Sequence, residues 1–214
     1  MSCCCSCEGT DRFFSKYAGK YARRFRKKGP DKPSRMIVEA LGRLGSRGKS
    51  VLDVGCGTGD VHLTLLREGA STAEGIDVSA GMLEQAQSLS KELGLEERVA
   101  YQEGDFVEQA SRVQNADIVV LDKVLCCYEF PDRLLEQASL KTKEFLAISF
   151  PSSSILASFS FRLMQWLGRV LRWSFHPFYH DPAELVRLVQ DRSFAQVFAG
   201  RTAIWQIMVF RRHG

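Results

Sequence analysis

A cluster of glycines that follows an acidic residue is the most informative feature of the sequence. Residues 51–60 read Val-Leu-Asp-Val-Gly-Cys-Gly-Thr-Gly-Asp, with Asp53 two residues ahead of Gly55, Gly57 and Gly59. The apolar start predicts a buried strand, and alternating glycines let the backbone turn sharply beneath a ligand. The dinucleotide fingerprint is G-x-G-x-x-G, whereas this chain has an aspartate in place of the last glycine. The run therefore predicts a ligand loop between a strand and a helix that is not a dinucleotide site.

Two more acidic residues end short predicted strands farther along the chain. Asp77 follows the glycines by about twenty residues, the distance at which doubly wound folds place an acid on ribose hydroxyls. The alternative is that Asp77 only caps the next helix, with Ser79 as a competing cap. A third predicted strand ends in Gly104, Asp105 and Phe106. Three motifs in register favour a nucleoside-binding site over three coincidences.

These motifs resemble those of the class I S-adenosylmethionine (SAM)-dependent methyltransferases, whose first motif is an acid followed by G-x-G-x-G. Over residues 50–150 the chain looks like the ubiquinone- and menaquinone-type small-molecule methyltransferases, and more distantly like magnesium-protoporphyrin methyltransferases. The resemblance implies SAM as the cofactor. The cofactor-binding residues that it implies are Asp53, Gly55, Gly57, Gly59, Asp77, Val78, Asp105, Phe106 and Asp122.

The exit from the fourth predicted strand departs from the family pattern. Residues 121–128 read Leu-Asp-Lys-Val-Leu-Cys-Cys-Tyr, which places Cys127 where many small-molecule methyltransferases have a histidine that shapes the acceptor pocket. We expect Cys126 and Cys127 to form small parts of the pocket wall rather than nucleophiles. Asp122 is the stronger functional candidate.

The transfer that the resemblance implies is an in-line displacement, in which the acceptor attacks the sulfonium methyl group of SAM. The protein has to align the two reactants and exclude water, and a base is needed only when the acceptor is protonated. The candidate catalytic residues are His176, His180 and Asp122. Each has a plainer alternative. His176 could be a packed residue, His180 could only precede a helix cap, and Asp122 could only contact the cofactor.

The order of apolar segments predicts a doubly wound α/β fold. We expect strands near 50–54, 73–77, 98–102, 116–121, 145–150, 195–199 and 204–210. We expect helices near 34–44, 59–68, 80–93, 106–112, 132–142 and 182–191. The resemblance implies a seven-stranded, mostly parallel, Rossmann-like sheet in the order 3-2-1-4-5-7-6, with an N-terminal helical cap and an inserted helix after the fifth strand.

The N-terminal arm is basic and aromatic. Residues 11–49 hold thirteen Lys or Arg against three Asp or Glu, a net charge of +10 in a chain whose total is +4. Aromatic residues recur there at helical spacing, including Tyr17 and Tyr21, which favours a cap helix that contacts substrate over a nucleic-acid-binding arm. We therefore divide the chain into a flexible Cys-rich tail (1–10), a basic helical cap (11–49) and a methyltransferase domain (50–214).

An apolar segment at about 151–180 is an insertion that the core fold does not require. Its large apolar residues recur every three or four positions and are interspersed with Arg162, Arg169 and Arg172. An ordinary helix packed on the sheet is one interpretation. The other is a lid or an interfacial helix, which predicts a hydrophobic acceptor and peripheral membrane contact. The expected substrate contacts are Tyr17, Tyr21, Cys127, Tyr128, Trp166 and Tyr179.

Composition sets the remaining limits. The chain has 214 residues, 45% of them apolar and 25% charged, which suits one globular domain in the cytoplasm with no membrane span or secretory signal. Its seven cysteines are expected to be reduced, and Cys3, Cys4, Cys5 and Cys7 are too crowded to form a complete metal site, so no metal is expected. Two alternatives to a small-molecule methyltransferase stay open: an RNA methyltransferase guided by the basic arm, and a SAM-binding protein without turnover.

Overall fold

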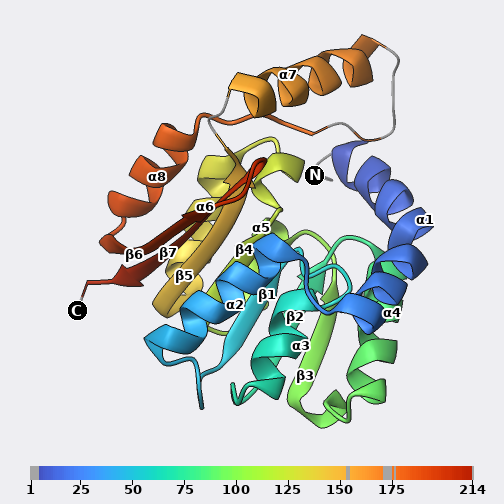
Figure 1. The fold of residues 1–214 in the computed structure, drawn as a ribbon, viewed down its shortest axis with the longest axis vertical. Helices are drawn as coiled ribbons and strands as arrows, with labels where there is room; N and C mark the ends of the chain where they lie inside the picture. The colour runs from blue at the N-terminus through green and yellow to red at the C-terminus, as the bar shows by residue number, and fades with distance from the viewer. Residues whose placement is uncertain (1–4, 153–154, 171–174, 176, 214) are drawn as a thin grey trace.

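A seven-stranded sheet forms the centre of the protein. The computed structural model describes residues 5–152, 155–170, 175 and 177–213 (Figure 1). The strands are β1 (Val51–Val54), β2 (Ala73–Asp77), β3 (Val99–Glu103), β4 (Ala116–Asp122), β5 (Thr142–Pro151), β6 (Phe194–Arg201) and β7 (Trp205–Arg212). Their order is β3-β2-β1-β4-β5-β7-β6, with the first five parallel and β7 antiparallel to both of its neighbours. The predicted fold class and strand order are confirmed.

Helices cover both faces of this sheet (Figure 1). They are α1 (Cys5–Lys28), α2 (Lys32–Leu44), α3 (Asp60–Arg67), α4 (Ala80–Glu92), α5 (Phe106–Gln109), α6 (Pro131–Lys141), α7 (Ile155–Val170) and α8 (Pro182–Gln190). Side chains at the N-caps start four of them, because Asp31, Ser79, Asp105 and Asp181 accept backbone N–H groups of α2, α4, α5 and α8. The predicted helix over 106–112 is α5 followed by a 3₁₀ turn at Ala110–Arg112.

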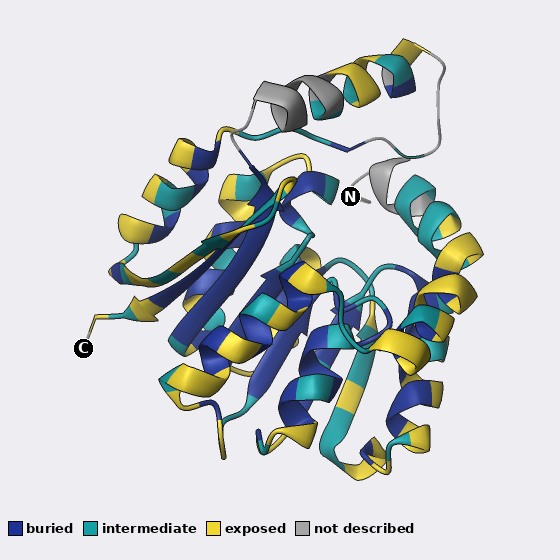
Figure 2. Cartoon of the chain, in the orientation of Figure 1, coloured by how far each residue is buried: buried dark blue, intermediate teal, exposed yellow. Residues whose placement is uncertain are grey.

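The sheet is buried on both faces, as Figure 2 shows for its central strands. Successive side chains of a strand point to opposite faces. Val120 of β4 accordingly belongs to the core cluster that includes α2 and α3, whereas Val119 and Leu121 belong to the cluster that includes α6 and α8. The carboxyl ends of the parallel strands are therefore held in fixed positions along one edge of the sheet.

The N-terminal arm differs in part from its prediction. Helix α1 begins at Cys5, so residues 5–10, which were predicted to belong to a flexible tail, are helical. Residues 11–49 contain two helices separated by Gly29 and Pro30, and Gly29 adopts a left-handed φ of 68° that interrupts the helical path. Helix α1 packs along α4, whereas α2 packs on β7.

Helix α7 lies over the carboxyl edge of the sheet and away from its faces (Figure 1). Leu163, Trp166 and Val170 are exposed, and Trp166 shows 59% of its surface. These exposures contradict the interpretation of this segment as an ordinary helix packed on the sheet. Among the described residues, no helix combines the length and the apolar character that crossing a membrane requires.

Candidate cofactor and acceptor site

A cavity of about 530 Å³ opens at the carboxyl ends of β1, β2 and β4. Its floor consists of the loops that follow these strands, and its upper wall comes from α1, α7 and Phe175. Ligands of open α/β sheets bind at this edge, in the crevice beyond the carboxyl ends of the strands. The fold therefore brings most of the predicted motif residues to one cavity.

The glycine loop of the cavity floor has a geometry that only glycine fits well. Gly55, Gly57 and Gly59 all adopt left-handed φ angles. A Cβ atom on Gly55 would lie 2.3 Å from Cγ2 of Val124, whereas a Cβ on Gly57 would meet nothing within 4 Å. The loop thus packs tightly against the exit of β4 at Gly55 and leaves space above Gly57.

Asp77 faces the same cavity from the end of β2. Its Oδ2 accepts the Gly57 N–H at 2.7 Å, and its Oδ1 accepts the Ser79 N–H at 2.8 Å. Burial raises the pKa of its carboxyl group to about 6 despite these two hydrogen bonds. Ser79, rather than Asp77, accepts the Met82 N–H and caps α4. Asp77 is thus left to face the cavity, as its predicted role requires.

Asp53 lies on the cavity wall but is engaged behind it. Its Oδ2 lies 2.8 Å from Nδ1 of His62, and Nε2 of the same ring lies 3.1 Å from the hydroxyl of Tyr101. His62 is fully buried on α3. This pair joins β1 to α3 across the glycine loop. Sequence reasoning missed His62, although its place one turn into the helix after the loop could have suggested a partner for the acid.

Asp105 and Tyr128 lie together at the far side of the cavity. Asp105 caps α5 by accepting the Val107 N–H at 2.8 Å, and the hydroxyl of Tyr128 donates to its Oδ2 at 3.1 Å. Phe106 and Val78 complete this part of the wall. Tyr128, predicted as a substrate contact, therefore lies beside Asp105, which was predicted to bind the cofactor.

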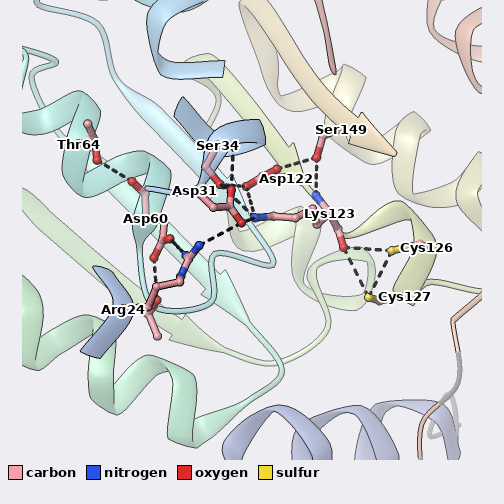
Figure 3. A network of polar contacts seen from close by, with 11 residues as sticks. Arg24, Asp31, Ser34, Asp60, Thr64, Asp122, Lys123, Cys126, Cys127 and Ser149 are labelled. Carbon is pink, nitrogen blue, oxygen red and sulfur yellow. Dashed lines mark hydrogen bonds and ion pairs between the residues drawn. The ribbon is translucent and has the colours of Figure 1, made fainter. Parts of the chain in front are cut away.

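Asp122 belongs to a network of polar side chains at the exit of β4 (Figure 3). Its Oδ1 accepts the Ser149 hydroxyl at 2.6 Å, its Oδ2 accepts the Ser34 hydroxyl at 2.6 Å, and Nζ of Lys123 lies 3.2 Å from Oδ2. Burial alone would raise the pKa of Asp31, but Lys123 lowers it to about 2. Asp122 lines the cavity, and these contacts join α2, β4 and β5.

Arg24 connects helix α1 to this network. Its Nη1 lies 3.2 Å from Oδ2 of Asp31, and its Nη2 donates to Oδ2 of Asp60 at the start of α3. Arg26 pairs in addition with Glu92 of α4. The sequence did not indicate which acidic residues these arginines would meet. Both attach α1 to the domain, which supports the prediction of a cap helix.

Aromatic and apolar side chains form the upper wall of the cavity. Phe13 and Phe14 of α1 lie with ring centroids 4.9 and 5.2 Å from that of Phe175. The other large apolar residues of this wall are Tyr21, Phe161, Met164 and Trp205. The sequence indicated an aromatic cap, but it did not indicate that β7 would contribute Trp205.

The remaining predicted substrate contacts are divided between the cavity and its surroundings. Tyr21 and Cys127 lie on the wall. The ring centroid of Tyr17 lies 5.1 Å from that of Phe13, and Tyr17 is not one of the described wall residues. Tyr179 is not one of them either. Trp166 points outward from α7 and is too exposed for the predicted contact.

Neither candidate histidine is one of the described residues of the cavity wall. Nε2 of His180 lies 2.9 Å from the backbone carbonyl of Tyr128, and its ring stacks on Phe178. His180 therefore supports the β4 exit loop from behind. His176 lies outside the described residues.

Comparisons with known proteins identify the class to which this fold and site belong. The methyltransferase domain family matches residues 46–173, and the chain belongs to this family. Ribosomal protein L11 methyltransferase of Deinococcus radiodurans is 37% identical over 71 residues, which is 33% of this chain and 26% of that protein. Probable tocopherol O-methyltransferase of Oryza sativa is 36% identical over 81 residues, 35% of this chain and 22% of that protein. The chain thus matches about a quarter of the length of these curated relatives.

A solved structure matches nearly the whole chain. Magnesium protoporphyrin IX methyltransferase of Synechocystis, with bound SAH, superposes with a TM-score of 0.73 and 20% identity over 97% of this chain and 100% of that chain. At this identity the likeness shows the fold. Together with the family, it confirms the predictions of a methyltransferase domain and of SAM as its cofactor.

Proposed function

We propose that the protein transfers the methyl group of SAM to a hydrophobic small-molecule acceptor. One observation carries this proposal: a single cavity has the SAM motifs on its floor and aromatic side chains on its upper wall. A donor on the floor and an apolar acceptor under α1 and α7 would share this space. Holding both reactants in a water-poor cavity is the main contribution that methyl transfer asks of a protein.

The residues of the cavity floor fit SAM. The open space above Gly57 accommodates a ligand at the loop, and the buried carboxylate of Asp77 suits the hydroxyls of a ribose. Asp105, Phe106 and Gly55 line the same cavity, and we infer that the first two hold the adenine and that Gly55 shapes the loop beneath the methionine part. When bound, SAM supplies an electrophilic methyl group on sulfur. The chain binds and orients the reactants and excludes water.

The candidate bases among the described residues favour an acceptor that needs no deprotonation. Asp122 accepts the hydroxyls of Ser34 and Ser149, and His180 is not one of the described residues of the cavity wall. A carboxylate is already ionised near neutral pH and carries its own lone pairs. Among the hydroxyl, carboxyl and ring-carbon acceptors that an apolar cavity admits, we therefore propose a carboxylate on a hydrophobic skeleton.

Methyl-labelled SAM tests this proposal directly. We expect incubation of the protein with a cell extract to place label in an organic-soluble small molecule. The label should be released as methanol by mild base, as from a methyl ester. Recovery of the label in RNA would contradict the proposal and support the alternative of an RNA methyltransferase. Absence of all transfer, with SAM still bound, would support the alternative of a SAM-binding protein.

Two neighbouring residues of α7 provide a matched pair of variants for the same assay. Met164 and Leu163 are 42% and 43% exposed, but only Met164 lies on the cavity wall. Met164→Ser should raise the KM for the labelled acceptor and leave the Kd for SAM unchanged, whereas Leu163→Ser should change neither. Equal effects of the two substitutions would show that the acceptor does not bind under α7.

The outer surface of α7 supports peripheral membrane contact. Leu163, Trp166 and Val170 form an exposed apolar stripe, and the sequence has no acidic residue between positions 152 and 180. We expect Leu163→Ser combined with Trp166→Ser to reduce co-sedimentation with anionic phospholipid vesicles, because both side chains would insert at the interface. The thermal midpoint should stay nearly the same, and Met164→Ser serves as the control. Undiminished co-sedimentation of the double variant would rule out this surface.

A further inference from the structure

Three of the cysteines lie at the cavity. Cys56, Cys126 and Cys127 all line its wall. The sequence places the other four, Cys3, Cys4, Cys5 and Cys7, shortly ahead of Thr10, which lies on the same wall. Methyl transfer by the mechanism proposed above needs no thiol. The three thiols at this cavity therefore call for another explanation.

Cys126 and Cys127 are adjacent in sequence, and their sulfur atoms lie side by side. The two Sγ atoms are 3.8 Å apart in the 3₁₀ turn after β4 (Figure 3). Each also lies within 3.5 Å of the backbone carbonyl of Lys123. This turn is held in place, because the Cys127 N–H donates to the Val124 carbonyl and the Phe178 N–H donates to the Cys126 carbonyl. The two sulfurs are thus positioned before any ligand arrives.

This spacing matches two ligands of a tetrahedral metal ion. With zinc–sulfur bonds of about 2.3 Å, sulfurs 3.8 Å apart subtend an angle of roughly 110° at the metal. We propose that Cys126 and Cys127 together chelate a thiophilic metal ion, with Zn²⁺ as the representative, on the wall of the acceptor cavity. The pair supplies two of four ligands, and no group of three potential His, Cys, Asp or Glu ligands occurs among the described residues. Two positions are therefore left for ligands from the cavity side.

The affinity of the Cys126–Cys127 pair for such an ion should depend on pH. A cysteine thiol has to lose its proton before its sulfur can bind a metal ion. Binding forms two sulfur–metal bonds and releases the two thiol protons to solvent. Metal affinity should accordingly increase with pH.

Titration of the reduced, full-length protein with Zn²⁺ and with Co²⁺ tests the site without measuring turnover. We expect the wild-type protein to bind one equivalent and to show thiolate-to-cobalt charge-transfer absorption. Cys127→Ser should weaken Zn²⁺ binding by at least about tenfold, because one of the two thiolate bonds is lost. Cys126→Ser should act likewise. Thermal unfolding in the presence of a chelator shows whether each variant is folded.

Two further proteins complete the experiment. Cys56→Ser removes another thiol of the cavity wall and should bind Zn²⁺ as the wild type does. A variant with serine at positions 3, 4, 5 and 7 should keep the affinity that depends on Cys127. If this variant loses the cobalt absorption while Cys127→Ser keeps it, the metal binds the N-terminal cysteines and the proposal is wrong. Equal binding by all variants would show adventitious metal only and would also overturn it.

Discussion

Gly55→Ala should abolish SAM binding and lower the free energy of unfolding. Gly55 has a φ of 66°, and its added Cβ would lie 2.3 Å from Cγ2 of Val124. The left-handed backbone costs a residue with a Cβ about 1–2 kcal/mol. Overpacking against Val124 adds a further cost of about 1–3 kcal/mol or displaces the glycine loop. Isothermal titration with SAM and chemical denaturation measure the two effects.

Gly94→Ala is the matched control for this substitution. Gly94 has a φ of 65°, and a Cβ there meets nothing within 4 Å, so this variant carries only the backbone cost. Combining Gly55→Ala with Val124→Ala removes the two closest contacts and should restore part of the stability. Equal losses from Gly55→Ala and Gly94→Ala would show that the packing against Val124 is unimportant.

The sequence predicted the sheet, and SAM as the cofactor, because both predictions depend on local signals. Consecutive residues determine a strand that ends in an acid and a glycine turn. The parallel fold then brings the ends of β1, β2 and β4 to one edge of the sheet. The structure was needed to show that Asp77 does not cap α4. Ser79 takes the capping role, which both residues could fill by sequence alone.

The interactions across the cavity could not be predicted in the same way. Arg24 meets Asp60 from a helix that lies 36 residues earlier in the chain, and Trp205 reaches the cavity from β7. Such contacts depend on how α1 and the last strands pack. A basic or aromatic sequence pattern does not show which residues those side chains will contact. The periodicity of α7 was read correctly as a helix with an apolar stripe. The side of α7 that faces the cavity was not predicted, because the apolar stripe was assigned around Trp166, whereas Met164, on another side of the helix, lines the wall.

Asp77→Asn should weaken SAM binding by roughly 10- to 100-fold. The carboxylate lies on the cavity wall at the end of β2, and its loss removes charge-assisted hydrogen bonds to the ribose worth about 1.5–3 kcal/mol. Glu103→Gln, on exposed surface at the end of β3, is a suitable control. Calorimetry that gives the same SAM affinity for Asp77→Asn and the wild type would remove the basis for the assigned ribose contact.

The same variant makes a separate prediction about stability and pH. In the folded, unliganded protein burial raises the pKa of Asp77 from 3.8 to about 6, so the folded state holds this proton more tightly than the unfolded chain does. The stabilisation from the proton is fully present below pH 3.8 and is lost as pH rises through 6. The stability of Asp77→Asn relative to the wild type should therefore increase by up to about 3 kcal/mol between pH 4 and pH 8. The variant also loses the hydrogen bond from Gly57 or Ser79, which lowers its free energy of unfolding by the same amount at pH 4 and at pH 8. A difference in unfolding free energy that stays constant over this pH range would show that the pKa of Asp77 is not raised.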